Sequence, residues 1–133
     1  MSPVVLDTDA ASLIHKRRLP PKLAGRLVAT TPVITFVTMA ELTKWMHLRD
    51  WGTRNRDALA AWLATIPVLP GDEDVAMVWG ALAAAAVRRG RPRPVNDMWI
   101  AACCLTHGLP LVTLNVKDFA DFATHHGLDL ITT

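Results

Sequence analysis

The sequence predicts an α/β fold in which helices cover a short central sheet of parallel strands. Short β-branched runs alternate along the 133 residues with longer segments of helical periodicity. This alternation is typical of parallel sheets with helices on both faces. Hydrophobic residues make up 51% of the chain, which excludes a disordered protein. No repeat or long linker interrupts the pattern, so we expect a single domain over residues 1–133.

The first part of the chain contains two predicted strands, each followed by a helix. The run "PVVLD" predicts a short buried strand, and a helix over 10–18 follows until a Pro-Pro pair stops it. A short helix over 22–29 precedes the second strand, "TPVITFV" over 31–37. The helix after that strand, over 38–51, has an apolar stripe that we expect to face the core.

The same alternation continues to the end of the chain. A helix over 96–107 is apolar nearly all round, so we expect it to be central and buried, and Gly108 ends it. The pair His125 and His126 precedes a glycine and fits a helix C-terminus. The other predicted elements are helices over 54–64 and 72–89 and short strands over 66–70, 109–115 and 128–133.

The composition also indicates where the protein acts and how its cysteines behave. No apolar run approaches the roughly 18 residues needed to span a bilayer, and the N-terminus lacks the basic region of a signal peptide. We therefore expect a cytoplasmic protein without a membrane anchor. The two cysteines, Cys103 and Cys104, are neighbours that point to different sides of a helix, so we expect buried, inert thiols rather than a metal site.

Two groups of acidic residues follow the first two strands. Asp7 and Asp9 come directly after the first strand, where either can cap the next helix. Glu41 stands three residues after Thr38, the spacing of a capping box with Thr38 as N-cap. Structural capping and a functional role remain alternatives for each of these acids.

Two further acids have the same ambiguity later in the chain. Asp97 lies in the first turn of the central helix, where a carboxylate favours the helix dipole, yet the ten residues after it are almost wholly apolar. We therefore expect Asp97 at the mouth of the core. Asp118 lies just past a strand end and can cap a helical turn, and Asn115 before it offers an amide oxygen.

Together the acids share a location. Strand C-ends and helix N-termini lie at one edge of a parallel sheet, so we expect Asp7, Glu41, Asp97 and Asp118 to converge there. Bare carboxylates in one cleft repel and raise each other's pKa, which indicates a divalent cation among them. Oxygen ligands without nearby His or Cys favour Mg²⁺ or Mn²⁺ over Zn²⁺.

A basic segment stands just before the central helix. The net charge of +2 does not by itself indicate nucleic acid, but "RRGRPRP" contains four arginines. We expect an exposed loop, because unpaired arginines are not buried. It is either a solvated connector or a loop that contacts phosphates through Arg88, Arg89, Arg91 and Arg93.

Four segments, "VVLDTDAASLIHK", "TFVTMAEL", "RPVNDMWIAACC" and "LVTLNVKDF", resemble in order and spacing the motifs of PIN-domain ribonucleases, specifically VapC-type toxins of type II toxin–antitoxin pairs. They cover nearly the whole chain. The resemblance implies a three-layer α/β/α sandwich with a short parallel sheet. It also implies Mg²⁺- or Mn²⁺-dependent cleavage of RNA (tRNA or rRNA) that inhibits translation and growth, homodimerisation, and inhibition by a cognate VapB-type antitoxin.

The resemblance also assigns roles to individual residues. Asp7, Glu41 and Asp97 match the family's core catalytic and metal-binding acids, and Asp118 matches a fourth, more variable one. Either Asn115 or Asp118 fills that fourth site. The residues expected to support these ligands by hydrogen bonding are Thr8, Thr113 and Asn115, together with Asp9, which stands where the family often has Asn.

Two other functions compete with this interpretation. The D-x-D of "VVLDTDA" also resembles a phosphatase of the haloacid-dehalogenase type, in which Asp7 is the nucleophile, but the later motifs of that family are missing from the chain. A non-catalytic module that binds RNA and antitoxin is the second alternative, and it needs an incomplete acid set. Trp45 or Trp51 could stack on a base, although tryptophans in a small domain are more often part of the core.

Overall fold

The structure is a computed structural model, and it describes residues 1–49 and 52–133. Over these residues the chain forms five parallel strands in one sheet and seven helices, in the order β3-β2-β1-β4-β5 for the strands. The predicted α/β class with a parallel sheet is confirmed. The strands are β1 (Ser2–Leu6), β2 (Thr30–Thr35), β3 (Val68–Leu69), β4 (Leu111–Val112) and β5 (Leu130–Ile131).

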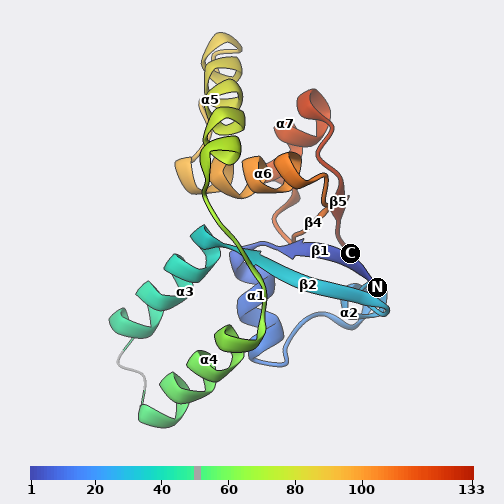
Figure 1. Cartoon of the computed structure of the whole chain (residues 1–133). Coiled ribbons are helices and arrows are strands. Elements are labelled where there is room, and N and C mark those ends of the chain that lie inside the picture. The colour runs from blue at the N-terminus through green and yellow to red at the C-terminus, as the bar shows by residue number, and fades with distance from the viewer. Residues whose placement is uncertain (50–51) are drawn as a thin grey trace.

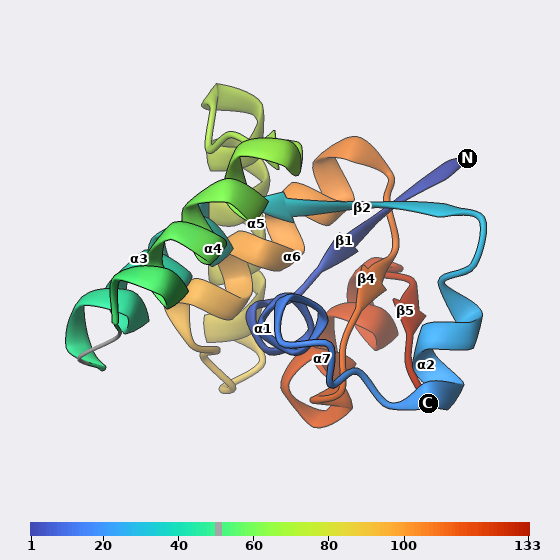
Figure 2. The ribbon, with the colours of Figure 1, turned by 90° about the horizontal axis from the view of Figure 1, so that it is seen from below.

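Helices cover both faces of this sheet and make three layers (Figures 1 and 2). One face carries α1 (Thr8–His15), α2 (Pro21–Arg26), α3 (Phe36–Leu48) and α4 (Thr53–Thr65), and the other carries α5 (Glu73–Arg88), α6 (Val95–His107) and α7 (Val116–His126). Alternate residues of β1 supply the two cores. Val5 packs into the cluster with α5, α6 and α7, whereas Leu6 packs into the cluster with α1 and α4.

Strand register aligns the carboxyl ends that carry the site. Leu6 at the end of β1 pairs with Val112 at the end of β4. The N–H of Asp7 continues this ladder by donating to the carbonyl of Val112 at 3.0 Å. The residues that follow β1 and β4 therefore start from neighbouring points on the same sheet edge, as Figure 2 shows for the starts of α1 and α7.

The boundary between β2 and α3 differs from the predicted one. The strand ends at Thr35, whose Oγ1 caps α3 by accepting from the N–H of Thr38 at 3.2 Å. The predicted capping box of Thr38 and Glu41 is therefore wrong. Phe36 and Val37 look like a continuing strand, but Thr35 ends the strand by offering a side-chain cap, and Val37 is then buried as part of the helix. The end of the helix predicted over 38–51 lies outside the described residues.

The C-terminal third differs in one element. The sequence predicted only a helical turn near Asp118 and a helix end at His126, whereas α7 runs without a break over Val116–His126. Its fully buried residues Phe119 and Phe122 lie three apart on one face, so α7 is amphipathic and its helical pattern was present in the sequence but not recognised. The strands β4 and β5 are shorter than the predicted segments.

Two smaller expectations concern cysteine and the membrane. Cys103 and Cys104 are both buried free thiols, as predicted, and burial raises the pKa of Cys103 to about 11. No helix in the described ranges has the length and apolar character to cross a bilayer.

Candidate active site

Five acidic side chains line one small cavity at the carboxyl edge of the sheet: Asp7, Asp9, Glu41, Asp97 and Asp118. The cavity has a volume of about 110 Å³, and we call it the acidic notch after the four acids expected to bind metal: Asp7, Glu41, Asp97 and Asp118. Asp7 follows β1, while Asp97 and Asp118 lie in the first turns of α6 and α7. Glu41 was predicted in a first turn but lies in the second turn of α3. The structure thus brings together the four acids that the sequence singled out.

Asp7 caps a helix and lines the notch at once. It is 3% exposed, and its Oδ1 accepts from the N–H of Ala10 at 2.8 Å as the N-cap of α1. Its Oδ2 accepts from the hydroxyl of Thr113 at 2.6 Å. Burial raises the pKa of Asp7 to about 6, with the charges of Asp9 and Asp97 adding to this and the two hydrogen bonds opposing it. The two roles considered for Asp7 therefore coexist.

Asp97 has the second strongly perturbed carboxylate of the notch. Its pKa is raised to about 6, first by burial and then by the negative charges of Asp118 and Glu41, while Arg93 acts in the opposite direction. In the described part of the chain no hydrogen bond or ion pair engages the carboxylate of Asp97 or that of Asp118. The notch therefore holds unrelieved negative charge.

A pair of threonines holds Glu41. The hydroxyl of Thr8 donates to Glu41 Oε1 at 2.8 Å, and the hydroxyls of Thr8 and Thr38 are 3.0 Å apart. Because Thr8 uses its only proton on Glu41, its oxygen accepts from Thr38. Thr8 thus has the predicted supporting position. Thr38 was not predicted as part of the site, and its position three residues before Glu41 was the only available signal.

The polar residues after β4 complete the wall. The side-chain amide of Asn115 donates to Asp9 Oδ2 at 2.7 Å, and the N–H of Asn115 donates to the Thr113 hydroxyl oxygen at 2.9 Å. The hydroxyl of Thr113 is then free to donate to Asp7. Each of these three residues lies beside the acids, as the sequence predicted, with Asp9 paired to Asn115 instead of standing alone.

The donor set of the notch suits a hard divalent cation. The cavity walls offer carboxylate, hydroxyl and amide oxygens and contain no His or Cys. Among the described residues, no three His, Cys, Asp or Glu side chains already stand in a coordinating arrangement. Asp7 and Glu41 are fixed by hydrogen bonds, whereas Asp97 and Asp118 can rotate. The residues fit such an ion if these two side chains turn inward.

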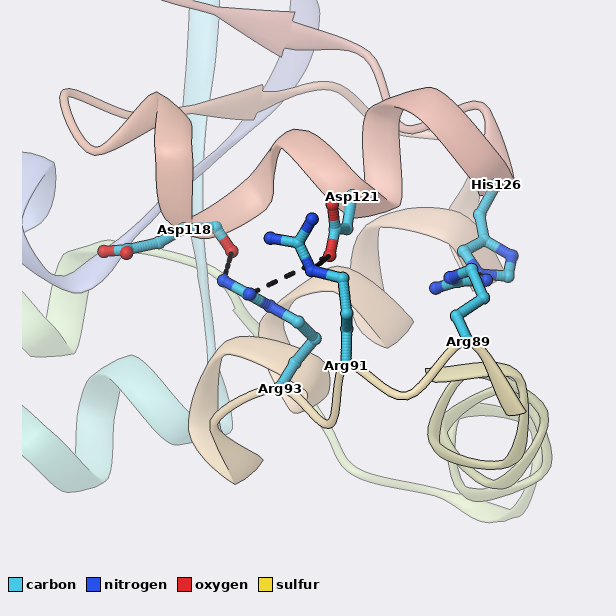
Figure 3. Close-up of polar contacts among 6 residues, drawn as sticks. All are labelled: Arg89, Arg91, Arg93, Asp118, Asp121 and His126. Atoms are coloured by element: carbon cyan, nitrogen blue, oxygen red, sulfur yellow. Dashed lines mark hydrogen bonds and ion pairs between the residues drawn. The ribbon is translucent and has the colours of Figure 1, made fainter. Parts of the chain in front are cut away.

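The arginine loop packs against α7 (Figure 3). Arg93 donates to the carbonyl of Asp118 at 3.4 Å and lies 3.8 Å from Asp121 Oδ2, while Nε of Arg91 lies 3.7 Å from the same oxygen. Arg89 lies 3.4 Å from Nε2 of His126. Figure 3 shows the carboxylate of Asp118 pointing away from these arginines.

The expectation of four exposed arginines is therefore only half right. Arg88 and Arg91 are exposed, but the side chain of Arg93 is only 17% exposed and that of Arg89 is half-buried. The reason is α7, which supplies partners that the sequence did not reveal. Asp118 of α7 lines the notch, whereas Asp121 of the same helix pairs with the arginine loop.

The sequence of this chain is similar to those of known proteins along most of its length. Residues 4–125 match the profile of the PIN domain. Ribonuclease VapC1 of Haemophilus influenzae (strain R2866) is 32% identical over 123 residues, which span 86% of this chain and 88% of that protein. Ribonuclease VapC5 of Mycobacterium tuberculosis is 34% identical over 123 residues, 87% of this chain and 84% of that protein.

Solved structures give the same picture. VapBC-5 from M. tuberculosis, a member of the VapBC family of toxin–antitoxin systems, aligns with a TM-score of 0.75 and 29% identity over 100% of both chains. VapBC-1 from nontypeable H. influenzae aligns with a TM-score of 0.81 and 28% identity over 96% of both. DNA-bound VapBC from Salmonella typhimurium aligns with a TM-score of 0.84 and 25% identity over 99% of this chain and 98% of that one.

Proposed function

The chain belongs to the PIN-domain family and, within it, to the VapC ribonucleases, and on that premise we propose that it cuts RNA at the acidic notch as the toxin of a VapBC-type pair. The observation that carries the proposal is the convergence of four carboxylates from four separate elements on one cavity. Packing alone gives no reason to gather like charges in this way.

Cleavage depends on Mg²⁺ or Mn²⁺ held by the four acids. Such an ion, when bound, lowers the pKa of a water molecule and offsets charge on the scissile phosphate. Thr113 and the N–H of Ala10 fix Asp7, and Thr8 fixes Glu41, so two ligands are oriented in advance. Asp97 or Asp118, whose carboxylates are not held by such bonds, orients the attacking water.

The substrate and partners follow from the same premise. The chain acts in the cytoplasm on tRNA or rRNA, and cleavage inhibits translation and growth until a VapB-type antitoxin binds. Exposed Arg88 and Arg91 contact flanking phosphates. The protein is a homodimer, and the exposed apolar residues of α5, such as Met77 at 76% exposure, support this assignment.

Neither alternative function gains support from the site. The haloacid-dehalogenase alternative loses support because residues 4–125 match the PIN domain and the later motifs of the phosphatase family are missing from the chain. A non-catalytic module needs an incomplete acid set, whereas all four acids line the cavity.

Purified protein incubated with total tRNA or rRNA tests the proposal. We expect new 5′ ends with Mg²⁺ or Mn²⁺ and none with EDTA. Asp97→Asn, which is nearly isosteric, should lose cleavage while circular dichroism shows an intact fold. A wild-type protein that binds RNA in the presence of either metal without cutting it would instead support the non-catalytic module.

A further inference from the structure

A second, larger cavity of about 380 Å³ opens beside the acidic notch. Asp9, Trp45 and Asn115 belong to the walls of both cavities, so the two are continuous. An RNA strand with one phosphate in the notch must place its neighbouring nucleotide close to this second space. The volume lies near the lower end of the roughly 300–1,000 Å³ typical of small-ligand sites.

The side chains of the second cavity differ in charge from those of the notch. Lys16 and Arg49 bring two cations to its wall, and the one acid there, Asp9, is already paired with Asn115 at 2.7 Å. Leu13 supplies apolar surface next to the cations. A wall that combines cations with apolar surface suits a nucleotide, which carries a negative phosphate and a flat apolar base.

The exposed guanidinium of Arg49 lies over the face of the Trp45 ring, so the two form a layered stacking platform. The guanidinium carbon of Arg49 lies 5.0 Å from the centre of the Trp45 ring. Unpaired bases stack on aromatic rings and on arginine guanidinium planes. The Trp45 ring also packs against the core cluster under α1 and α4, which fixes its position. A base that stacks here meets a rigid surface.

The spacing along α3 links this surface to the reaction centre. Glu41, Trp45 and Arg49 follow one another at four-residue intervals, so they form one line along the helix from the notch into the second cavity. On α1, Asp9 and Lys16 are seven residues apart and stand on the facing wall. The two helices thus border a path for about one nucleotide.

We propose that the second cavity is the subsite for the unpaired nucleotide next to the scissile phosphate. Its base stacks on Trp45 and Arg49, and a phosphate of the strand contacts Lys16. This inference rests on the proposed ribonuclease function and deepens it, because it names the residues that read the RNA beside the cut.

Binding of a fluorescein-labelled single-stranded oligoribonucleotide to the Asp97→Asn protein isolates binding from cleavage. Adding Trp45→Leu should weaken binding about 5- to 150-fold, the effect of losing one base–aromatic stack. Trp45→Phe keeps an aromatic face and should retain most of the affinity. Trp62→Leu is the matched control, because Trp62 packs against the same core cluster but lines neither cavity, and it should bind like the parent.

Salt dependence tests the cation separately. Lys16→Gln should reduce the slope of log K against log salt by roughly 0.7, the value for one phosphate contact on a single strand. Lys22→Gln, on the exposed surface of α2, should leave the slope unchanged.

Three outcomes overturn the subsite. If the Trp45→Leu and Trp62→Leu proteins bind RNA with equal affinity, the second cavity is not a nucleotide subsite. The proposed function still stands in that case if the protein without these substitutions cuts RNA. If Trp45→Leu leaves RNA binding intact and weakens only the complex with a co-expressed VapB-type partner, the cavity belongs to protein recognition. A wild-type protein that neither binds nor cuts any RNA removes the function and the subsite together.

Discussion

Among single residues, Asp7 connects the stability of the fold to the chemistry of the site. Its carboxylate follows the first strand, caps α1 and lines a cavity together with four other acids. The capping bonds favour its charged form, but burial and the neighbouring charges outweigh them and raise its pKa to about 6. The folded protein therefore binds a proton at Asp7 more tightly than the unfolded chain, whose aspartate keeps its ordinary value of 3.8.

This difference sets a sign for the effect of pH on the metal-free protein. Between pH 3.8 and about 6 the folded state holds more protons at Asp7 than the unfolded state, so the free energy of unfolding falls as pH rises through this window. Above about pH 6 the destabilisation caused by the charged Asp7 no longer changes with pH. We expect Asp7→Asn, which caps about as well as Asp, to gain stability relative to wild type as pH rises from 4 to 7 in EDTA. Thermal melts across this pH range measure the gain.

Metal should make the wild type more stable than the Asp7→Asn protein, the reverse of the order expected in EDTA near neutral pH. Ion binding at a hundredfold excess over its dissociation constant stabilises the wild type by about 2.7 kcal/mol, or roughly 10 °C in melting temperature. The Asp7→Asn protein should lose most of that increase. An identical response of both proteins to Mg²⁺ would make Asp7 a cap alone.

Among the elements, α7 decides which arginines of the loop stay exposed. Arg91 and Arg93 approach the same oxygen of Asp121, but the side chain of Arg91 is 66% exposed and that of Arg93 only 17%. Arg93 also holds the carbonyl of Asp118, so it joins the start of α6 to the first turn of α7. The two arginines are a matched pair for separating RNA binding from packing.

We expect substitutions of the exposed arginines to weaken RNA binding, and substitution of the half-buried Arg93 to lower stability. Replacing exposed Arg88 and Arg91 by Ala should reduce the salt slope of RNA binding by roughly 0.7 for each lost phosphate contact, with little change in stability. Arg93→Ala should instead lower the free energy of unfolding by about 1–3 kcal/mol, because it leaves the carbonyl of Asp118 without its side-chain donor and Asp121 with only the exposed Arg91 as an ion-pair partner. Urea denaturation measures the change in the free energy of unfolding. If the Arg93→Ala protein is as stable as wild type but its RNA binding depends less on salt, Arg93 contacts RNA directly.

The same element shows what the sequence could and could not predict. The chain order of the five described strands and of six helices followed from alternating patterns. Three of the four acids followed from their places at a strand end or a helix start, whereas Glu41 was expected in a first turn and lies in the second. The length of α7 was not predicted, although its buried residues Phe119 and Phe122 give it an amphipathic helical pattern. Its contacts with Arg89 and Arg93, and the contact of Thr38 with Thr8, depend on how distant elements pack, which no local pattern encodes.

For the whole molecule, α5 carries an unusual free face. It projects from the body of the domain in Figure 1. The exposed residues between its acidic start and Arg88 are uncharged and mostly small: Ala76, Met77, Gly80, Ala81, Ala84 and Val87. Small residues allow a second helix to approach closely, and apolar faces of this kind mark interfaces.

We therefore expect a dimer at micromolar concentration that pairs through this face. Met77→Glu combined with Ala84→Glu should give a monomer, because a carboxylate buried without a partner is costly. Light scattering measures the mass. Ala61→Glu, on the exposed side of α4, is the control and should stay dimeric. A wild-type monomer would contradict the expectation, and so would a dimer that survives both substitutions.

The bond between Asp7 and Thr113 joins residues 106 positions apart, and this separation has a consequence during synthesis. At about 5–20 residues per second, a ribosome takes roughly 5–20 s between them. Throughout that interval the nascent chain has three of the four acids at most, and β1 lacks its neighbour β4. We therefore expect a chain truncated anywhere before Leu111 to lack cleavage activity, so that the nuclease site forms only after synthesis of the domain is nearly complete.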